Sequence, residues 1–349
     1  MPRPPLRLAR PLDSVRWNRD RRGHVESWFL KANDPVDPGR ALWIKFTLLA
    51  PREPSTEVPV AEVWAIRFDG RGGHHRAGKS THAVAECTLG ESGVDLTFGG
   101  CVLRPDHSTG AVGEGDGRIA WDLRWDRAGQ RASFGFPARW MYERAFPKSK
   151  TYTSCPTTSL RGTLSLGDET WALHGWPGML GHNWGRTHNP RYQWAQCSMF
   201  RPTAGGDLLE DTFFEGFSAR VAMGPLLTPW LTGAVVRVRG EDLAFNHLLG
   251  LFNPSARPGR FAWSLESRRG RRRLRWTVAA APEDFVGLRY FDPGGRENQC
   301  LNSKIADCRL ELWKREGRGW VPEADLTGSQ SCAYEVLNLA PPHGVSMQV

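Results

Sequence analysis

The amino-acid sequence predicts an all-β protein made of antiparallel barrels or sandwiches. Bulky apolar residues alternate with small or polar ones along many short segments, which is the period of a half-buried antiparallel strand. Gly, Pro or Asp separates most of these segments, and no helical pattern of ten residues intervenes. A doubly wound α/β fold is therefore excluded, because it needs a helix between successive strands.

The expected strands follow one another along most of the chain. They cover residues 41–48, 61–68, 118–125, 192–200, 212–222, 243–251, 261–266, 273–280, 285–291, 308–313 and 332–338. A helical turn is expected only within residues 137–145. The arginine-rich run 268–273 lies between two alternating segments, so it is expected at the solvated tip of a hairpin, with contact to a polyanion or a membrane surface as the alternative.

The chain has 349 residues, which allows one large domain or two of ordinary size. A weak internal echo favours two. Its matching positions are Gly23, His24, Trp43 and Pro51 in the first half, and Gly181, His182, Trp194 and Pro202 in the second. The offset of about 160 residues is the size of one up-and-down barrel. We therefore expect two tandem barrels, over residues 1–178 and 179–349.

The net charge of +9 does not indicate a nucleic-acid partner, because most of the positive charge is Arg spread over the whole length. The seven cysteines are odd in number and lack Cys-x-x-Cys spacing, so neither a disulfide framework nor a zinc ribbon is indicated. The first residues contain no apolar core of a signal peptide, and no apolar run approaches eighteen residues. These features predict a cytoplasmic protein, with transient contact at a membrane surface left open.

A central motif carries a resemblance to a known family. His182-Asn183-Trp184-Gly185 is followed by a strand that contains Tyr192, Trp194, Gln196, Cys197 and Phe200. This arrangement resembles the central motif of the tocopherol cyclase family. Residues 23–31, with Ala41-Leu42-Trp43 after them, are similar to the beginning of that family's first barrel.

The wider group includes carotenoid 1,2-hydratases (hydroxyneurosporene synthases), AttH-like proteins and fungal lipocalin-like cyclases. The resemblance covers residues 23–68 and 146–217, and it implies two tandem lipocalin-like barrels with few short helices. This chain has His182 where tocopherol cyclases carry a lysine, so the resemblance leaves the reaction open.

Three residues are candidate proton donors: Glu215, His182 and His247. Glu215 shares a strand face with Phe213 and Phe217, and a carboxyl group among aromatic rings resists ionisation, as a general acid requires. A structural carboxylate paired with Arg is the alternative. His247 lies on an apolar strand face, where a hydrogen-bonded core histidine is the alternative.

Further residues are candidates for contact with a substrate: Trp184, Asn183, Trp194, Gln196, Glu26, Trp28 and Trp64. Indole faces stabilise cations, but Trp184 can equally plug the base of a barrel while Gly185 lets the backbone bend. His182 and Asn183 can likewise serve only to hydrogen-bond a loop. No metal site is expected, because His74-His75 lack companion ligands at metal-binding spacing, and no cofactor is expected.

A barrel rich in Trp and Phe with one or two neutral acids suits a hydrophobic substrate that reacts through a cation. The sequence thus predicts a cofactor-independent hydratase (a lyase) or cyclase (an isomerase) acting on an isoprenoid or polyketide alkene, by protonation and carbocation capture or by holding the substrate folded. A non-catalytic carrier of lipids or terpenoids is the alternative, because lipocalin-like barrels hold apolar ligands without chemistry.

Overall fold

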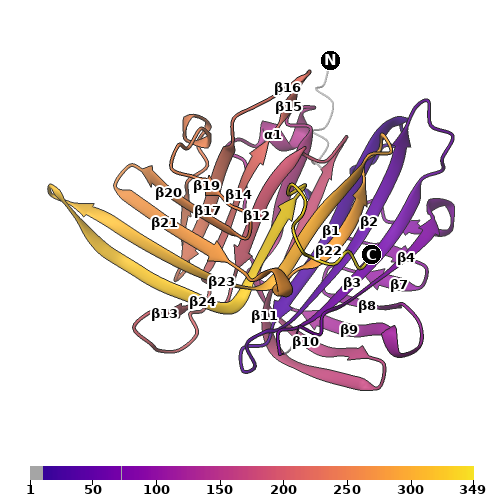
Figure 1. Cartoon of the computed structure of the whole chain (residues 1–349), viewed down its shortest axis with the longest axis horizontal. Coiled ribbons are helices and arrows are strands. Elements are labelled where there is room, and N and C mark those ends of the chain that lie inside the picture. The colour runs from indigo at the N-terminus through magenta and orange to yellow at the C-terminus, as the bar shows by residue number, and fades with distance from the viewer. Residues whose placement is uncertain (1–10, 72) are drawn as a thin grey trace, which may run out of the picture.

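The computed structural model describes residues 11–71 and 73–349, which form two curled antiparallel sheets of eleven strands each (Figure 1). The all-β prediction is confirmed. In the first sheet the strand order is β4-β3-β2-β1-β11-β10-β9-β8-β7-β6-β5. Its strands are β1 (Arg22–Asn33), β2 (Arg40–Arg52), β3 (Val60–Asp69), β4 (Arg76–Ala83), β5 (Thr88–Leu89), β6 (Leu96–Phe98), β7 (Cys101–Leu103), β8 (His107–Val112), β9 (Ile119–Trp125), β10 (Ser149–Leu166) and β11 (Glu169–Gly185).

The second sheet has the order β18-β17-β14-β12-β24-β23-β21-β20-β19, with β13 added to β24 and β22 added to β23. Its strands are β12 (Arg191–Cys197), β13 (Arg201–Pro202), β14 (Phe213–Arg220), β17 (Leu231–Val238), β18 (Glu241–Ala244), β19 (Arg257–Pro258), β20 (Ala262–Arg269), β21 (Arg272–Ala279), β22 (Val286–Phe291), β23 (Glu297–Glu316) and β24 (Gly319–Leu337). A separate hairpin pairs β15 (Ala222–Met223) with β16 (Leu226–Leu227).

Helices are short in the described part of the chain. They are α1 (Trp140–Glu143), which falls inside the expected helical turn, and the 3₁₀ turns η1 (Val84–Glu86), η2 (Gly115–Gly117), η3 (Leu248–Leu251) and η4 (Pro282–Asp284). None of these helices has the length and apolar character needed to cross a bilayer.

The two sheets repeat the same topology. In the first, β1 lies between β2, which follows it, and β11, which closes the unit; in the second, β12 lies between β14 and β24 in the same way. The sequence echo does not mark this repeat, because it aligns β1 with β11, which are neighbours in one sheet. The chain passes between the sheets after Gly185, which lies beyond the expected boundary at 178 because β11 pairs with both β1 and β10.

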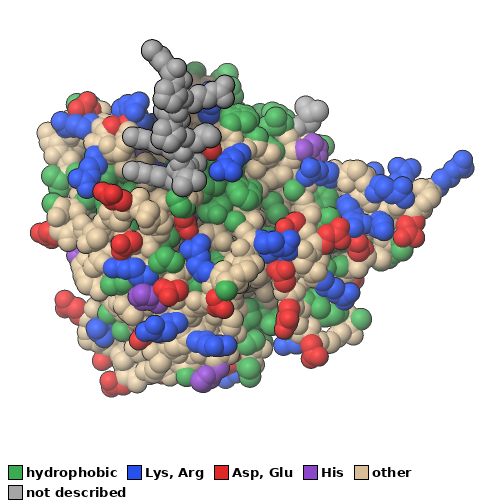
Figure 2. Space-filling view, turned by 180° about the vertical axis from the view of Figure 1, so that it is seen from behind, with side chains coloured by type: hydrophobic (Ala, Val, Ile, Leu, Met, Phe, Trp, Pro, Cys, Tyr) green, Lys and Arg blue, Asp and Glu red, His purple; other side chains and the backbone are tan. Residues whose placement is uncertain are grey.

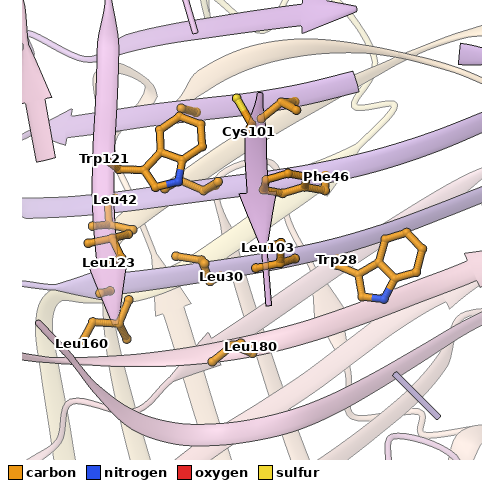
Figure 3. Packing of buried hydrophobic residues seen from close by; sticks show 14 of the residues in the cluster. Trp28, Leu30, Leu42, Phe46, Cys101, Leu103, Trp121, Leu123, Leu160 and Leu180 are labelled. Atoms are coloured by element: carbon orange, nitrogen blue, oxygen red, sulfur yellow. The ribbon is translucent and has the colours of Figure 1, made fainter. Parts of the chain in front are cut away.

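Each sheet encloses its own hydrophobic core. In the first core, alternate side chains of β1 and β2, including Trp28, Leu30 and Phe46, meet Leu123 and Leu160 from β9 and β10 (Figure 3). In the second core, the rings of Phe214 and Trp276 stack with centroids 3.6 Å apart. This alternation is what the period-two pattern of the sequence predicts.

A third cluster joins the two units, which lie side by side (Figure 1). It consists of outward-facing residues of both sheets; the largest are Phe29, Trp43, Trp64 and Phe68 from the first, and Trp194 and Tyr290 from the second. We call this cluster the junction. It shows why β1, β2 and β12 carry apolar residues on both faces: one face fills a barrel and the other packs against the neighbouring barrel.

The strand expected at 243–251 is wrong beyond its first residues. The backbone of Phe245 still pairs with Ala234, but the Asn246 side chain then donates hydrogen bonds to the carbonyls of Phe134 and Gly135, and the chain turns into η3. The strands expected at 192–200 and 212–222 end earlier, at Cys197 and Arg220. The hairpin expected at 268–273 is confirmed, with Gly270 at its turn at a φ of 57°.

Candidate functional site

Two buried carboxyl groups, from Glu26 on β1 and Glu215 on β14, lie on opposite sides of the strand pair β10–β11. Glu26 lies inside the first barrel, where its neighbour across β1 and β11 is Trp184. Glu215, on β14, lies in the junction and reaches Thr153, which is on the outer face of β10. The two acids therefore share the same supporting strands but have different surroundings.

Glu26 is fully buried and accepts a hydrogen bond on each oxygen from a histidine. His182 Nε2 lies 2.8 Å from Oε1, and His24 Nε2 lies 2.8 Å from Oε2. Burial alone would raise the pKa of Glu26, but the hydrogen bonds from His182 and His24 outweigh it and lower the pKa. Glu26 is therefore a carboxylate.

The His182 ring lies between two indoles. Trp28 stacks on one side, with ring centroids 4.8 Å apart, and Trp184 on the other, at 4.7 Å. The second ring nitrogen, Nδ1, lies 2.7 Å from the carbonyl oxygen of Leu12. Both partners of the ring nitrogens are acceptors, so a doubly protonated ring satisfies them together, and the indole faces stabilise that charge.

The segment that precedes β1 closes this end of the first barrel. The backbone N–H of Arg16 donates to both Glu26 oxygens, at 2.8 and 3.0 Å, and the N–H of Trp17 donates to Oε2 at 3.1 Å. Trp28 Nε1 donates to the carbonyl of Asp13 at 2.8 Å. In this arrangement the protein itself supplies the partners of Glu26, and the ion pair holds residues 12–17 across the barrel end.

The glycines of the central motif fit this packing. A Cβ at Gly185 would lie 2.2 Å from the carbonyl oxygen of Lys148, so only glycine lets β11 approach the chain there. A Cβ at Gly181 would overlap the ring of Phe29 in the junction. The motif therefore places His182 and Trp184 on the inner face of β11 while keeping its outer face close to its neighbours.

Glu215 is an isolated buried acid. Thr153 Oγ1 donates to its Oε1 at 2.7 Å, and Trp194 Nε1 donates to the same oxygen at 3.3 Å. Burial raises the pKa of Glu215, and hydrogen bonding from the neutral side chains of Thr153, Trp194 and Ser133 only partly opposes that shift. In the described part of the chain no Lys, Arg or His forms an ion pair with it.

A small cavity lies beside Glu215 between the two barrels. Its volume is about 10 Å³, just enough for one water molecule. The first half contributes Gly135 and Thr151, and the second half contributes the remaining lining residues, which are Trp194, Glu215, Phe217, Gly233, Ala234 and Val235. The site at Glu215 is thus completed only where the two barrels meet.

Aromatic side chains of the segment around α1 link this cavity to Trp184. The ring of Phe136 contacts Phe217 at 6.1 Å and Tyr142 at 5.4 Å, and Tyr142 in turn lies 6.2 Å from Trp184. The Tyr142 hydroxyl accepts a hydrogen bond from the backbone N–H of Phe136. Together with Phe134, which contacts Tyr142, these rings form a continuous chain of aromatic contacts, which we call the aromatic bridge.

Two of the other residues predicted from the sequence lie beside the Glu215 site: Gln196 is paired with Glu215 across β12 and β14, and Asn183 is paired across β10 and β11 with Thr151, which lines the cavity. His247 is half-buried at the start of η3, and its Nδ1 has no hydrogen-bond partner among the described residues. Asn183 points to the outer face of β11, opposite His182. Gln196 donates to the carbonyl of Pro156, and Trp64 packs in the junction against Tyr290 and Lys79.

Sequence reasoning missed the polar residues buried in the junction. Lys304 and Glu335 form a buried ion pair at 2.9 Å, and Lys45 lies 3.8 Å from the centre of the Tyr290 ring. Burial lowers the pKa of Lys45 and of Lys31. A signal was present, because Lys31 and Lys45 each stand between two apolar residues within a predicted strand or barrel entry.

Comparison with known proteins shows the fold. No family model matches the chain. Two curated proteins, from two strains of Mycobacterium tuberculosis, are each 29% identical over 310 residues, covering 87% of this chain and 85% of the relative; both are uncharacterized. Among solved structures, a Nitrosomonas europaea protein assigned to AttH is similar with a TM-score of 0.53 and 12% identity, over 90% of this chain and 92% of that one.

The structure of CghA with Sch210972 is similar with a TM-score of 0.51 and 11% identity, over 90% of this chain and 88% of that one. At these identities the similarity extends to the fold, and it agrees with the lipocalin-like double barrel that the motif resemblance implies. The chain therefore has the fold of AttH-like proteins.

Proposed function

We propose that this protein is a cofactor-independent hydratase or cyclase that protonates an alkene of a hydrophobic isoprenoid or polyketide substrate, with Glu215 as the acid. The observation that carries the proposal is the environment of Glu215: it is buried, its pKa is raised, its hydrogen-bond donors are neutral side chains, and it lines a water-sized cavity between the barrels. A neutral carboxylic acid in an apolar site is the usual general acid near neutral pH.

The proposed reaction begins with proton transfer from Glu215 to the alkene. The Glu215 proton forms a C–H bond with one alkene carbon, the π electrons of the double bond form that bond, and the other carbon becomes a cation. In hydration, a water in the cavity forms the C–O bond and returns a proton to the Glu215 carboxylate. In cyclisation, an internal hydroxyl captures the cation and its O–H proton returns to the Glu215 carboxylate. Alternatively a second double bond captures the cation, and the new cation loses a neighbouring C–H proton to Glu215 as a double bond forms.

Neighbouring rings support a cationic intermediate. Trp194 and Phe217 line the same cavity, and π faces attract a positive charge that has left water. The cavity holds one water molecule and no polyene, so only the reacting end of the substrate would reach Glu215. The rest of the substrate would lie along the aromatic bridge.

Glu26 and Glu215 have different proposed roles. Glu26 is ionised and its oxygens accept hydrogen bonds from the protein, so we assign it and His182 to holding the N-terminal segment. Glu215, which retains its proton, is the proposed general acid.

The test is an incubation of the purified protein with C20 to C40 isoprenoid alkenes and polyketide polyenes in D₂O. We expect one deuterium at the protonated carbon of the product, and we expect Glu215→Gln to abolish turnover. The matched control is Glu266→Gln, at a half-buried carboxylate on β20 that is paired with Arg273 and Arg275. Retention of an unmodified polyene by both the wild type and Glu215→Gln would instead support a carrier, and it would overturn the enzymatic proposal.

A further inference from the structure

One end of the molecule carries a concentration of exposed apolar side chains. The hairpin β15–β16 presents Met223 and Leu226, which are 64% and 72% exposed, together with Leu227 and the turn Gly224-Pro225. The segment around α1 adds Phe134, Trp140 and Phe146. These two segments hold half of the large apolar residues that are exposed in the described part of the chain.

Both segments lie at the same end of the fold. Figure 1 shows β15, β16 and α1 at the top of the molecule, and Figure 2 shows hydrophobic side chains gathered at that end of its reverse side. Their connection also follows from contacts: Phe136, close to α1, touches Phe217 on β14, and β14 runs into the hairpin within a few residues. We call the exposed residues of the two segments the apolar end.

The charges beside the apolar end are mostly positive. Arg139, Arg144 and Lys148 are exposed on the α1 segment, where the one acid, Glu143, is paired with Arg139 at 3.3 Å. Residues 216–240, which include the hairpin, contain no Asp or Glu. A protruding apolar tip beside basic residues complements a membrane surface that carries anionic headgroups.

We propose that the apolar end docks on the surface of an anionic lipid bilayer, with the β15–β16 tip inserted among the acyl chains and Trp140 at the headgroup level. Indoles prefer that level, and a hairpin tip of Met, Pro and Leu loses little polar hydration on insertion. The surface is distinct from the junction, but α1 connects the two: Trp140 faces outward while Tyr142, half a turn later, belongs to the aromatic bridge. A lipid-dissolved molecule would thus meet the protein next to that bridge.

Vesicle sedimentation tests the proposal without any need for catalysis. The probes are vesicles of phosphatidylcholine alone and of phosphatidylcholine mixed with phosphatidylglycerol, each at low and at physiological salt. We expect binding to the mixed vesicles that weakens with salt, and a loss of about tenfold for Leu226→Ser combined with Leu227→Ser. Arg144→Gln combined with Lys148→Gln should lower the dependence on phosphatidylglycerol.

The control is Val321→Ser, an exposed apolar residue of β24 outside the apolar end, which should bind vesicles as the wild type does. All these substitutions are at exposed positions, and thermal unfolding confirms that each variant is folded. Absence of binding to the mixed vesicles, or equal binding by the Leu226→Ser and Leu227→Ser protein, overturns the proposal. A concentration-dependent dimer that the same variant abolishes, without vesicle binding, would assign the apolar end to a second copy of the chain instead.

Discussion

His182 Nε2 donates a hydrogen bond to Glu26 Oε1 across the paired strands β1 and β11, at 2.8 Å, with both side chains 1% exposed or less. The pair stands at the end of the first barrel, where residues 12–17 cross over it. A buried ion pair contributes little net stability compared with an apolar pair, but removal of one partner leaves an uncompensated charge. We therefore expect that loss of either Glu26 or His182 destabilises the packing of residues 12–17 on the barrel end.

The substitution Glu26→Gln should destabilise the protein by about 3–5 kcal/mol, because His182 and His24 lose their carboxylate partner in a buried site. Urea unfolding followed by Trp fluorescence measures the change. Glu266→Gln, at a carboxylate whose side chain is 38% exposed, should cost only about 1 kcal/mol. Equal and small effects of both substitutions would show that the Glu26 network does not fasten the barrel end.

The contribution of Glu26 should also depend on pH. Its pKa is lowered in the folded protein, so this contribution is fully present above the ordinary Glu pKa of about 4.3 and is lost as the pH falls through the lower folded value. The difference in unfolding free energy between wild type and Glu26→Gln should therefore narrow on acidification below about pH 4. A difference that stays constant from pH 7 to pH 3 would contradict the lowered pKa.

The contribution of Glu215 to stability should depend on pH in the opposite direction. Its pKa is raised, so the unfolded chain releases the proton more readily, and the wild type loses stability as the pH rises from the ordinary Glu pKa toward the folded value. Glu215→Gln keeps a neutral side chain at all pH values and should gain stability relative to the wild type over that interval. Urea midpoints of the two proteins at pH 4 and pH 7 measure this difference in stability. If Glu215→Gln were instead more stable relative to the wild type at pH 4 than at pH 7, Glu215 would be ionised in the folded protein.

The indole of Trp184 should contribute both packing and charge stabilisation. Trp184→Leu removes the face that stacks on His182 and should cost about 3 kcal/mol or more, whereas Trp184→Phe keeps a π face and should cost roughly half as much. Thermal unfolding at pH 6 compares the two variants. Equal losses would mean that Trp184 acts only by filling volume.

The sequence was most informative about faces of strands. Alternation predicted the all-β fold, and strand parity put Glu215 on the face of Phe213 and Phe217, where the structure has it. The motif 182–185 drew attention to His182 and Trp184 because it resembles the central motif of the tocopherol cyclase family. What alternation could not tell was which of two apolar faces fills a barrel and which packs in the junction.

The partners of Glu26 and Glu215 could not be predicted from the sequence, because they come from distant parts of the chain. Glu26 and His182 are 156 residues apart, and Thr153 meets Glu215 only because β10 of the first barrel packs against β14 of the second. Strands β10 and β11 were missed because bulges and glycines interrupt their alternation, as at Thr153 and Gly181. The turn after Phe245 was missed because Asn246 is held by carbonyls more than 100 residues away.

The protonation state of Glu215 is the central claim, and infrared spectroscopy measures it directly. The carbonyl stretch of a protonated carboxylic acid is recorded as a function of pH for the wild type and for Glu215→Gln, and the difference isolates Glu215. We predict a band that titrates with a midpoint above the ordinary Glu pKa of about 4.3 and is absent from Glu215→Gln. A difference band that titrates at or below that value would show an ionised carboxylate and contradict the account.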